Sequence, residues 1–600
     1  MKKSIFQKWL VISLLIVCFV CATLFLLAPS FTSQSSIGPE IHYYYGSADA
    51  LSKAADSSEF VSAIEPSENV NSVYVLDYEP YDMSFAQFAD LKASKAEVDS
   101  VMEDFRAKSK AYYSSKNQEF LSSMGVDKDS QDYQVVVSDY SPYVQITYED
   151  TSAFQKYENR FINRVKSNSD VSEIHVTTPI ELKKQSASTT SSVTRYDMSD
   201  VLKDIAADDQ TYTGRGQSVG IMEARGIATE NSHSELADLN IRTAGDTLND
   251  DEHAEWVTRL LCGSEGVARG INTVYVYHAS NASSFIPAMN WFLDNSCYVI
   301  NASVANNSNA GKYIWESAFA DFQVRYNRVI YSIGAGNEGS KSNHYTTPPG
   351  TAYNAITVAN STENAYIHNS SSYDTERDLN MNKPTLAAPG TGLYLNGKRL
   401  IGDKYPDNYN SGTSFAAPIV TGIIIKLLEE WPTLQLFPEA VSAVLIVSAT
   451  NANGQSDIWD KRAGAGIVNY QRARSVINNS TCRMLYNKNN SQDSIVLSSE
   501  NFTAKSGNKI RAVAIWSANS KTNARGDAVQ NNIHTNYDLI LNFVGDKDVL
   551  MRQGSGRTNM EFFVYKISLL SQSNFRLDLK QKDKKIVNDD DYGAIAWYVE

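Results

Sequence analysis

The chain has 600 residues, which is too many for one hydrophobic core and enough for roughly three or four domains. Its composition, 42% hydrophobic and 20% charged, is that of a globular protein and not of a disordered one. The formal net charge of −14 and the lack of a basic stripe, a P-loop, an HExxH pair or paired CxxC motifs argue against nucleic acid as the main partner.

Residues 9–28 form an uncharged apolar run, preceded by Lys2, Lys3 and Lys8. A helix of about twenty residues spans the hydrocarbon core of a bilayer, and this run exceeds the roughly 7–15 apolar residues of a cleavable signal peptide. The preceding lysines predict a cytoplasmic N-terminus, with residues 30–600 outside the cell membrane. We expect residues 1–30 to be an uncleaved signal-anchor, with a long cleaved signal peptide as the alternative.

Residues 40–185 alternate strands with helices and predict an α+β domain. Strands are expected at 72–76, 134–137, 143–148 and 171–177, and charged helices at 85–121 (one or two) and 151–165. Strand–helix–strand–strand–helix–strand is the order of a ferredoxin-like domain. Residues 186–194, which are rich in Ser and Thr, have little to bury and are expected to form a flexible linker.

Residues 195–475 alternate short β-branched runs with longer amphipathic stretches. The runs lie at 218–222, 273–278, 298–303, 329–334 and 355–359. Continuous apolar runs separated by helices predict a parallel sheet covered on both faces, and therefore an α/β domain. In such sheets, functional sites form where loops leave the carboxyl ends of the strands.

Residues 484–600 alternate apolar and polar side chains with a period of two, as in KIRAVAIWS (509–517). This pattern predicts an all-β sandwich of antiparallel strands. Outside the N-terminal apolar run lie Cys262, Cys297 and Cys482, an odd number without framework spacing. They are interpreted as buried apolar side chains, and a Cys262–Cys297 bridge is left open.

Residues 412–418 (GTSFAAP) carry the strongest chemical signal. Gly412 permits a tight turn into a helix, which places Ser414 where free N–H groups and the helix dipole favour a developing anion. Pro418 is expected to be tolerated because early helical N–H groups are unpaired. By the physics alone, an ordinary helix start capped by Ser and Thr would be the better explanation of this segment.

The GTSFAAP segment resembles the nucleophile motif of the subtilisin (subtilase) family of serine proteases. Three further blocks resemble family motifs in the family's order, namely 218–227 with 233–241 (the acid), 252–263 (the histidine) and 331–339, YSIGAGNEG (the oxyanion asparagine). The resemblance covers about residues 215–475. It implies Ser414 as the nucleophile, His253 as the general base and Asn337 as a donor to the oxyanion, in a serine endopeptidase that works through an acyl-enzyme.

Two departures from the family pattern leave an alternative open. Glu223 stands where the family has Asp, and Glu255 and Trp256 replace small or polar residues beside His253. We expect Glu223 to orient His253 as the triad acid, although its extra methylene requires a shift of about 1.5 Å. The alternative is a catalytically weakened or inactive protein of this fold that acts as a surface binding protein. A lipase or esterase is less consistent, since the GxSxG elbow is absent.

The resemblance also implies how a protein or peptide substrate is bound. Ala302, Ser303 and Val304 resemble the family's substrate-pairing segment and are expected to pair with the substrate's main chain. Glu338 would lie near the primary specificity pocket, where it either accepts a basic side chain or faces solvent. Structural calcium is common in the family, but no loop of EF-hand type occurs, and no cofactor is assigned.

The flanking regions resemble parts of longer subtilases. Residues 70–185 are similar in pattern and position to the inhibitory propeptide, which implies synthesis as a zymogen. A cut within 182–195 would separate the N-terminal anchor from the catalytic domain, so we expect maturation to release that domain from the membrane. The C-terminal sandwich resembles the jelly-roll modules that follow some subtilases, and its expected role is structural.

Overall fold

The computed structural model describes most of the chain after residue 65. The described residues are 42–46, 66–165, 171–179, 181–184, 187–189, 195–375, 381–395, 398–399, 401–402, 405–456, 459–487, 493–519, 533, 535–544, 549–554, 558–568, 572–584 and 591–600. The apolar run at 9–28 lies outside them. Among the helices within the described ranges, none is both long and apolar enough to cross a membrane.

The N-terminal domain is built on a five-stranded sheet with the order β1-β5-β2-β4-β3. The pattern predicted from the sequence is found as β2 (Val70–Leu76), α3 (Lys95–Met124), β3 (Tyr133–Val137), β4 (Tyr143–Tyr148), α4 (Thr151–Val165) and β5 (Val171–Thr177). The strands β5, β2, β4 and β3 are antiparallel neighbours in the ferredoxin-like order. An additional strand, β1 (His42–Gly46), pairs parallel with β5.

The helix expected at 85–121 starts later and is a single helix. A short 3₁₀ turn, η1 (Ala86–Phe88), precedes it, and α3 begins only after Ser94. Ser94 forms a capping box with Glu97, in which the Ser94 side chain accepts the Glu97 N–H and the Glu97 carboxylate accepts the Ser94 N–H at 2.8 Å. Gly125 ends the helix with φ 59°, a left-handed conformation that favours glycine. The caps at both ends therefore define one 30-residue helix.

The central domain contains the predicted parallel sheet, and it is α/β in class. Its order is β10-β11-β9-β12-β14-β15-β16, and every neighbouring pair is parallel. The five predicted runs become β9 (Ser218–Glu223), β11 (Thr273–His278), β12 (Val299–Ala302), β14 (Ile330–Gly334) and β15 (Ile356–Ser361). The edge strands are β10 (Asn240–Gly245) and β16 (Leu386–Pro389). Because the chain continues to opposite sides of β9, a crevice is expected at its carboxyl end.

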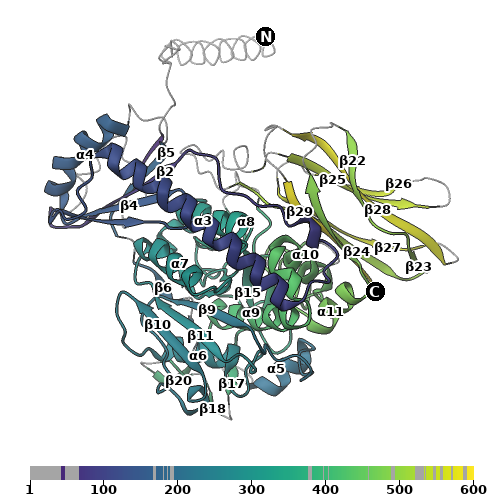
Figure 1. Cartoon of the computed structure of the whole chain (residues 1–600). Helices are drawn as coiled ribbons and strands as arrows, with labels where there is room; N and C mark the ends of the chain where they lie inside the picture. The colour runs from purple at the N-terminus through teal and green to yellow at the C-terminus, as the bar shows by residue number, and fades with distance from the viewer. Residues whose placement is uncertain are drawn as a thin grey trace, which may run out of the picture. The chain divides into compact units, whose positions relative to one another are not determined.

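Six longer helices accompany this sheet (Figure 1). They are α6 (Glu252–Cys262), α7 (Phe285–Asp294), α8 (Trp315–Asn327), α9 (Thr413–Glu430), α10 (Pro438–Ser448) and α11 (Tyr470–Asn478). The helix α9 packs against β12, β14, β15 and β16, and its residues are buried from Thr413 to Leu428. A helix that is apolar all round is stable only inside a core, and this position fixes its N-terminus at the carboxyl edge of the sheet.

The C-terminal region is the predicted antiparallel sandwich. One sheet is β21 (Cys482–Asn487), β29 (Asp591–Val599), β24 (Lys509–Trp516) and β27 (Met560–Lys566). The other is β22 (Ser494–Ser498), β28 (Ser573–Lys584), β25 (Thr535–Phe543) and β26 (Val549–Gln553), with the short strand β23 (Phe502–Ala504) also paired to β28. Alternate side chains of both sheets form one core between them, and β24 and β29 pack on α10.

The cysteines Cys262, Cys297 and Cys482 are free and buried. The bridge between Cys262 and Cys297 that the sequence left open is therefore not formed. Burial raises the pKa of the Cys262 thiol to about 12, so the neutral thiol behaves as a small apolar side chain.

Candidate active site

Three side chains from three separate elements meet at the carboxyl end of the parallel sheet. Glu223 is the last residue of β9, while His253 and Ser414 lie in the first turns of α6 and α9. The distance from Glu223 Oε2 to His253 Nδ1 is 2.8 Å, and His253 Nε2 lies 2.8 Å from Ser414 Oγ. The side chains of Glu223 and His253 are each 1% exposed. An acid, a base and a hydroxyl thus form one hydrogen-bonded series.

The imidazole of His253 is placed by the start of α6. Asp251 is the N-cap residue, and its carboxylate accepts the backbone N–H groups of His253 at 3.0 Å and of Ala254 at 3.4 Å. A proton on Nδ1 donated to Glu223 leaves Nε2 to accept the proton of Ser414. Sequence reasoning missed Asp251, although an Asp just before a helical run is a recognisable capping signal.

The unusual residues beside His253 do not disturb this series. Trp256 is buried, and its ring lies 6.2 Å from the ring of Phe415, which in turn lies 5.2 Å from the imidazole of His253. Glu255 pairs with Arg259 at 3.0 Å, one turn further along α6. Trp256 therefore supports the base through Phe415.

The first turn of α9 is tied to the loop after β14. Thr413 donates its N–H to Asn337 Oδ1, and its Oγ1 accepts the N–H of Gly336, both at 3.1 Å. Gly412, the N-cap residue, has φ 173°, which is extended backbone that any residue adopts, and no side chain caps the helix. The tight turn expected at Gly412 therefore needs no glycine conformation, and the alternative explanation of the segment, a helix start capped by Ser or Thr, does not hold either.

Asn337 presents an amide donor with nothing to bind. Its Oδ1 is occupied by Thr413, so the amide orientation is fixed. Its Nδ2 is buried and has no hydrogen-bond partner among the residues that the structure describes. Leaving such a buried donor unpaired costs about 1–3 kcal/mol. A donor kept in this state is typical of a binding site, where the hydrogen-bond partner arrives with the substrate.

Pro418 is the sixth residue of α9 and not part of its first turn, so the expected reason for its tolerance is wrong. A proline at this position removes the N–H that would bond to the carbonyl of Ser414. Ser303, just after β12, supplies the missing donor, because its Oγ lies 3.1 Å from the Ser414 carbonyl oxygen. Asn301 Nδ2 holds Ser303 Oγ at 3.0 Å. Ser303 thus acts on the backbone of the nucleophile.

Part of the chain's own N-terminal region lies along this site. The short strand β13 (Val304–Ala305) pairs antiparallel with β6 (Lys183–Lys184), and the neighbouring Ala302 ends β12. The strand β20 (Tyr405–Ser411) pairs antiparallel with β7 (Ala187–Thr189). Residues 187–189, predicted to be flexible linker, are therefore a strand. Main-chain donors and acceptors pair regardless of side chain, so a Ser/Thr-rich segment needs no core to do this.

Glu338 is held by two neighbouring side chains. Its Oε2 lies 2.6 Å from Lys341 Nζ, and its Oε1 accepts a hydrogen bond from Asn307 Nδ2 at 3.2 Å. The side chain is 14% exposed, so it does not simply face solvent. Because Lys341 already neutralises this carboxylate, a basic substrate side chain would have to displace an existing partner.

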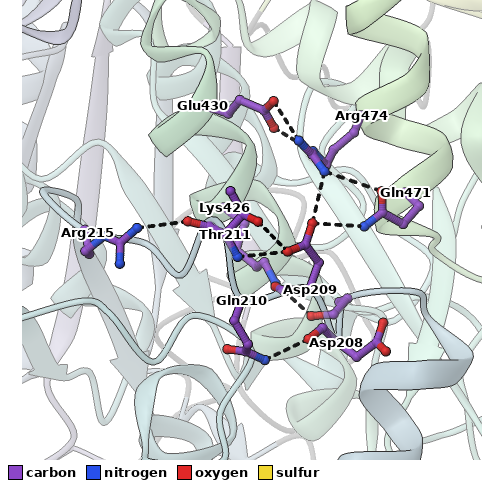
Figure 2. A network of polar contacts seen from close by, with 10 residues as sticks. Asp208, Asp209, Gln210, Thr211, Arg215, Lys426, Glu430, Gln471 and Arg474 are labelled. Atoms are coloured by element: carbon purple, nitrogen blue, oxygen red, sulfur yellow. Dashed lines mark hydrogen bonds and ion pairs between the residues drawn. The ribbon is translucent and has the colours of Figure 1, made fainter.

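Across the described residues, no group of three or more His, Cys, Asp or Glu side chains is arranged to hold a metal ion. One set of backbone carbonyls that could attract a cation binds a lysine instead. Lys426 Nζ donates to the carbonyls of Ala207 at 2.7 Å and Asp209 at 2.8 Å, and burial lowers the pKa of this lysine to about 8. Arg474 of α11 binds both Asp209 and Glu430 (Figure 2). This network ties the start of the central domain to α9 and α11.

Comparison with known proteins shows what the central part of the chain is similar to. Residues 240–466 match the Peptidase_S8 model of the subtilase family, a segment that holds His253, Asn337 and Ser414 but not Glu223. An alkaline proteinase of Hapsidospora chrysogena is 29% identical over 210 residues, which are 33% of this chain and 48% of that protein. The subtilisin-like serine protease Cla h 9.0101 of Davidiella tassiana is 34% identical over 132 residues, 20% of this chain and 23% of that protein. The chain thus spans about half or less of these relatives.

Two solved structures are also similar. Fervidolysin from Fervidobacterium pennivorans, described as a keratinolytic enzyme related to subtilisin, has a TM-score of 0.46 at 13% identity and covers 94% of this chain and 78% of its own. The prenylagaramide maturation protease PagA has a TM-score of 0.36 at 21% identity and covers 46% of this chain and 98% of its own.

Proposed function

We propose that this chain, whose residues 240–466 form a subtilase-family domain, is a serine endopeptidase that hydrolyses protein or peptide substrates. The observation that carries the proposal is the hydrogen-bonded series Glu223–His253–Ser414 beside the unpaired Nδ2 of Asn337. These are the groups that acyl transfer to a serine requires.

The site contains a group for each step of peptide-bond hydrolysis. Ser414 Oγ attacks the scissile carbonyl carbon while His253 Nε2 takes the hydroxyl proton, and Glu223 stabilises the imidazolium that forms. The carbonyl oxygen becomes an oxyanion that accepts a hydrogen bond from Asn337 Nδ2. His253 then returns the proton to the departing amine, and water hydrolyses the acyl-enzyme by the same path.

The alternative function, a surface binding protein with a decayed site, is less well supported. Its basis in the sequence was that Glu223 replaces Asp and that Trp256 lies beside the base. In the structure, Glu223 reaches His253 at 2.8 Å, and Trp256 packs on Phe415. A binding protein would have no need to keep this series intact.

We further propose that the protein is made as a zymogen and cuts itself. The pairs β6–β13 and β7–β20 place residues 183–184 and 187–189 beside the strands that flank Ser414. We therefore expect the cut at one of the peptide bonds between Lys184 and Ala187, the stretch of chain that joins the two paired segments. The N-terminal domain would block the site until that bond is cut.

The test is the intact mass of the full-length protein and of its Ser414→Ala twin, with N-terminal sequencing of any fragment. We expect only the wild type to be cut, with the new N-terminus at residue 185, 186 or 187. Cleavage of both proteins would assign the cut to another protease. If both stay whole and neither hydrolyses casein, the endopeptidase proposal fails.

We also propose that residues 9–28 anchor the protein in the cell membrane, with the catalytic domain outside. The support is the length of the apolar run and the lysines before it. Alkaline extraction of membranes tests the anchor, and an added protease acting on intact cells tests the orientation. Recovery of the whole uncut chain in the alkaline supernatant would contradict an anchor.

A further inference from the structure

A loop at residues 346–348 joins two sides of the active site. Thr347 donates its N–H to the carbonyl of Ala335 at 3.0 Å, in the segment that leads from β14 to the oxyanion donor. On the other side, Asn306, which directly follows β13, donates its N–H to the carbonyl of Pro348 at 2.9 Å. The strand β13 is the one that pairs with β6. The loop therefore bonds both to the oxyanion side of the site and to the end of the strand that holds the chain to be cut.

A buried acid is bound to the side chain of Asn306. Glu316, in the first turn of α8, is 0% exposed, and its Oε1 accepts a hydrogen bond from Asn306 Nδ2 at 3.0 Å. Its Oε2 is buried and has no hydrogen-bond partner within the described part of the chain. The backbone N–H of Glu316 lies close enough to lower the pKa of the carboxyl, but it does not form a hydrogen bond to Oε2. Burial is the larger influence and raises that pKa to about 7. One oxygen of this acid therefore has unused hydrogen-bonding capacity.

Two more buried polar atoms on the same segments are unpaired. Thr346 is 0% exposed, and its carbonyl accepts the N–H of Gly311 at 2.7 Å, while its Oγ1 has no partner among the residues described. Asn307 donates from Nδ2 to Glu338 Oε1 at 3.2 Å, which leaves its buried Oδ1 without a partner in the same ranges. Buried polar atoms without partners are uncommon, and each one needs an explanation. Three of them on segments that bond to one another indicate a site for a polar side chain of a ligand.

The three atoms match the hydrogen bonds of a primary amide. Glu316 Oε2 and Asn307 Oδ1 can accept the two N–H groups of an amide, and Thr346 Oγ1 can donate to its carbonyl oxygen. A lysine or arginine side chain fits less well, because an acid whose pKa is about 7 carries only part of the charge that a buried cation needs. An apolar side chain would leave all three atoms unpaired. The chemistry of the site therefore favours the side-chain amide of glutamine or asparagine.

The chain itself carries such a side chain where we expect it to be cut. The strand β6 ends at Lys184, and β7 begins at Ala187. The middle bond of the stretch between them joins Gln185 to Ser186, two residues that lie outside the described ranges. Cleavage at this bond would leave a glutamine on its amino side.

We propose that Glu316, together with Thr346 and Asn307, makes this protease select glutamine as the residue whose carbonyl is attacked. The inference rests on the proposed function, because it names which peptide bonds that reaction takes. Glu316 and Asn307 accept the N–H groups of the glutamine amide, and Thr346 donates to the amide oxygen. A site of this kind rejects other side chains strongly, because they leave its buried polar groups unpaired.

The test compares peptides that differ only in this residue. Full-length wild-type protein, after it has processed itself, is given internally quenched peptides with glutamine, leucine, glutamate or lysine before the scissile bond. The ratio of kcat/KM between two peptides does not depend on the fraction of active enzyme. We expect glutamine to exceed leucine by at least about 100-fold, because leucine lacks the polar group that the site is built to bind.

The outcomes separate this inference from the proposed function. A wild type that cleaves the peptides within about tenfold of one another, or that prefers a residue other than glutamine, would overturn the inference and leave the endopeptidase proposal intact. A wild type that cleaves none of the peptides and does not process itself would overturn the proposed function, and the inference with it.

Variants identify the side chains that make the choice. Glu316→Leu removes the acceptor and should lower the glutamine-to-leucine ratio of kcat/KM by at least about tenfold. Glu316→Gln is the matched control at the same position, since it keeps an oxygen acceptor and should keep most of the ratio. If Glu316→Leu does not fold, Thr346→Val replaces the hydroxyl by a methyl group of similar size and should lower the same ratio about tenfold. A loss of overall activity with an unchanged ratio would assign these residues a structural role and contradict the inference.

Discussion

The N-terminal domain contacts the central domain near both ends of the parallel strands, the carboxyl ends and the amino ends. The two contacts are of different kinds. At the carboxyl edge, β6 and β7 pair through main-chain hydrogen bonds with strands beside Ser414. At the amino ends of the strands, Lys95 and Asp99 of α3 line a groove with Ser218 and Thr273, and Phe105 of α3 is buried in the core of the central domain. Main-chain pairing suits a segment that a protease must accept and release, because it depends little on sequence. Side-chain packing, by contrast, depends on the shapes of the side chains that meet.

The largest expected effect tests the carboxyl edge directly. Ser414→Ala removes the nucleophile and should lower kcat for peptide hydrolysis on the order of 10⁶-fold, with the thermal unfolding of the protein unchanged. Steady-state cleavage of a fluorogenic peptide measures the loss. Ser340→Ala, at an exposed serine, is the control. Activity within tenfold of the wild type would remove Ser414 from the mechanism.

The next effect tests whether Glu223 serves as the triad acid. Glu223→Gln keeps the size of the side chain but removes the charge that holds the imidazole tautomer, and kcat should fall about 10⁴-fold. Glu223→Asp should be less impaired, because the carboxylate charge remains. Its side chain is one methylene shorter, so only the 2.8 Å hydrogen bond to His253 is lengthened. Equal activity of the Gln variant and the wild type would mean that Glu223 only fills space.

A smaller loss is expected from the oxyanion donor. Asn337→Leu removes the unpaired Nδ2 and should lower kcat about 10²–10³-fold with little change in KM, because the donor acts on the transition state. The variant also loses the bond from Thr413 N–H, so its unfolding is measured in parallel. A change confined to KM would assign Asn337 to substrate binding.

The smallest effect concerns α8, the helix between β13 and β14 in the chain. Burial raises the pKa of Glu316, near its start, to about 7. An unfolded chain releases this proton near pH 4.5 while the folded protein keeps it, so the free energy of unfolding should fall as pH rises from about 4.5 to 7. Glu316→Gln in the Ser414→Ala background should therefore gain up to about 3 kcal/mol over its parent at pH 8 but not at pH 4. Urea denaturation at both pH values measures this difference in the free energy of unfolding. An equal gain at the two pH values would contradict the raised pKa of Glu316.

The catalytic groups could be predicted from the sequence because each of them lies in a local sequence pattern. The apolar runs predicted the parallel strand that ends at Glu223 and the one that ends shortly before Asn337, and GTSFAAP placed Ser414 at the start of a helix. Even the true start of α3 had a local signal, since Ser94 and Glu97 stand at capping-box spacing. The role of Ser303 had none, because the carbonyl that it bonds is freed by Pro418, more than a hundred residues away in the chain.

The helix α3 shows most clearly what the sequence determines and what only the tertiary structure decides. The buried positions of α3 recur every three or four residues from Val98 to Met124 as one unbroken stripe. Such a stripe predicts an amphipathic helix and a buried face, which is what local periodicity can determine. It does not say that Phe105 faces one core and Phe120 another, because burial is non-directional and any apolar surface satisfies it. That choice, and with it the second contact of the N-terminal domain, was made only by the packing of distant elements.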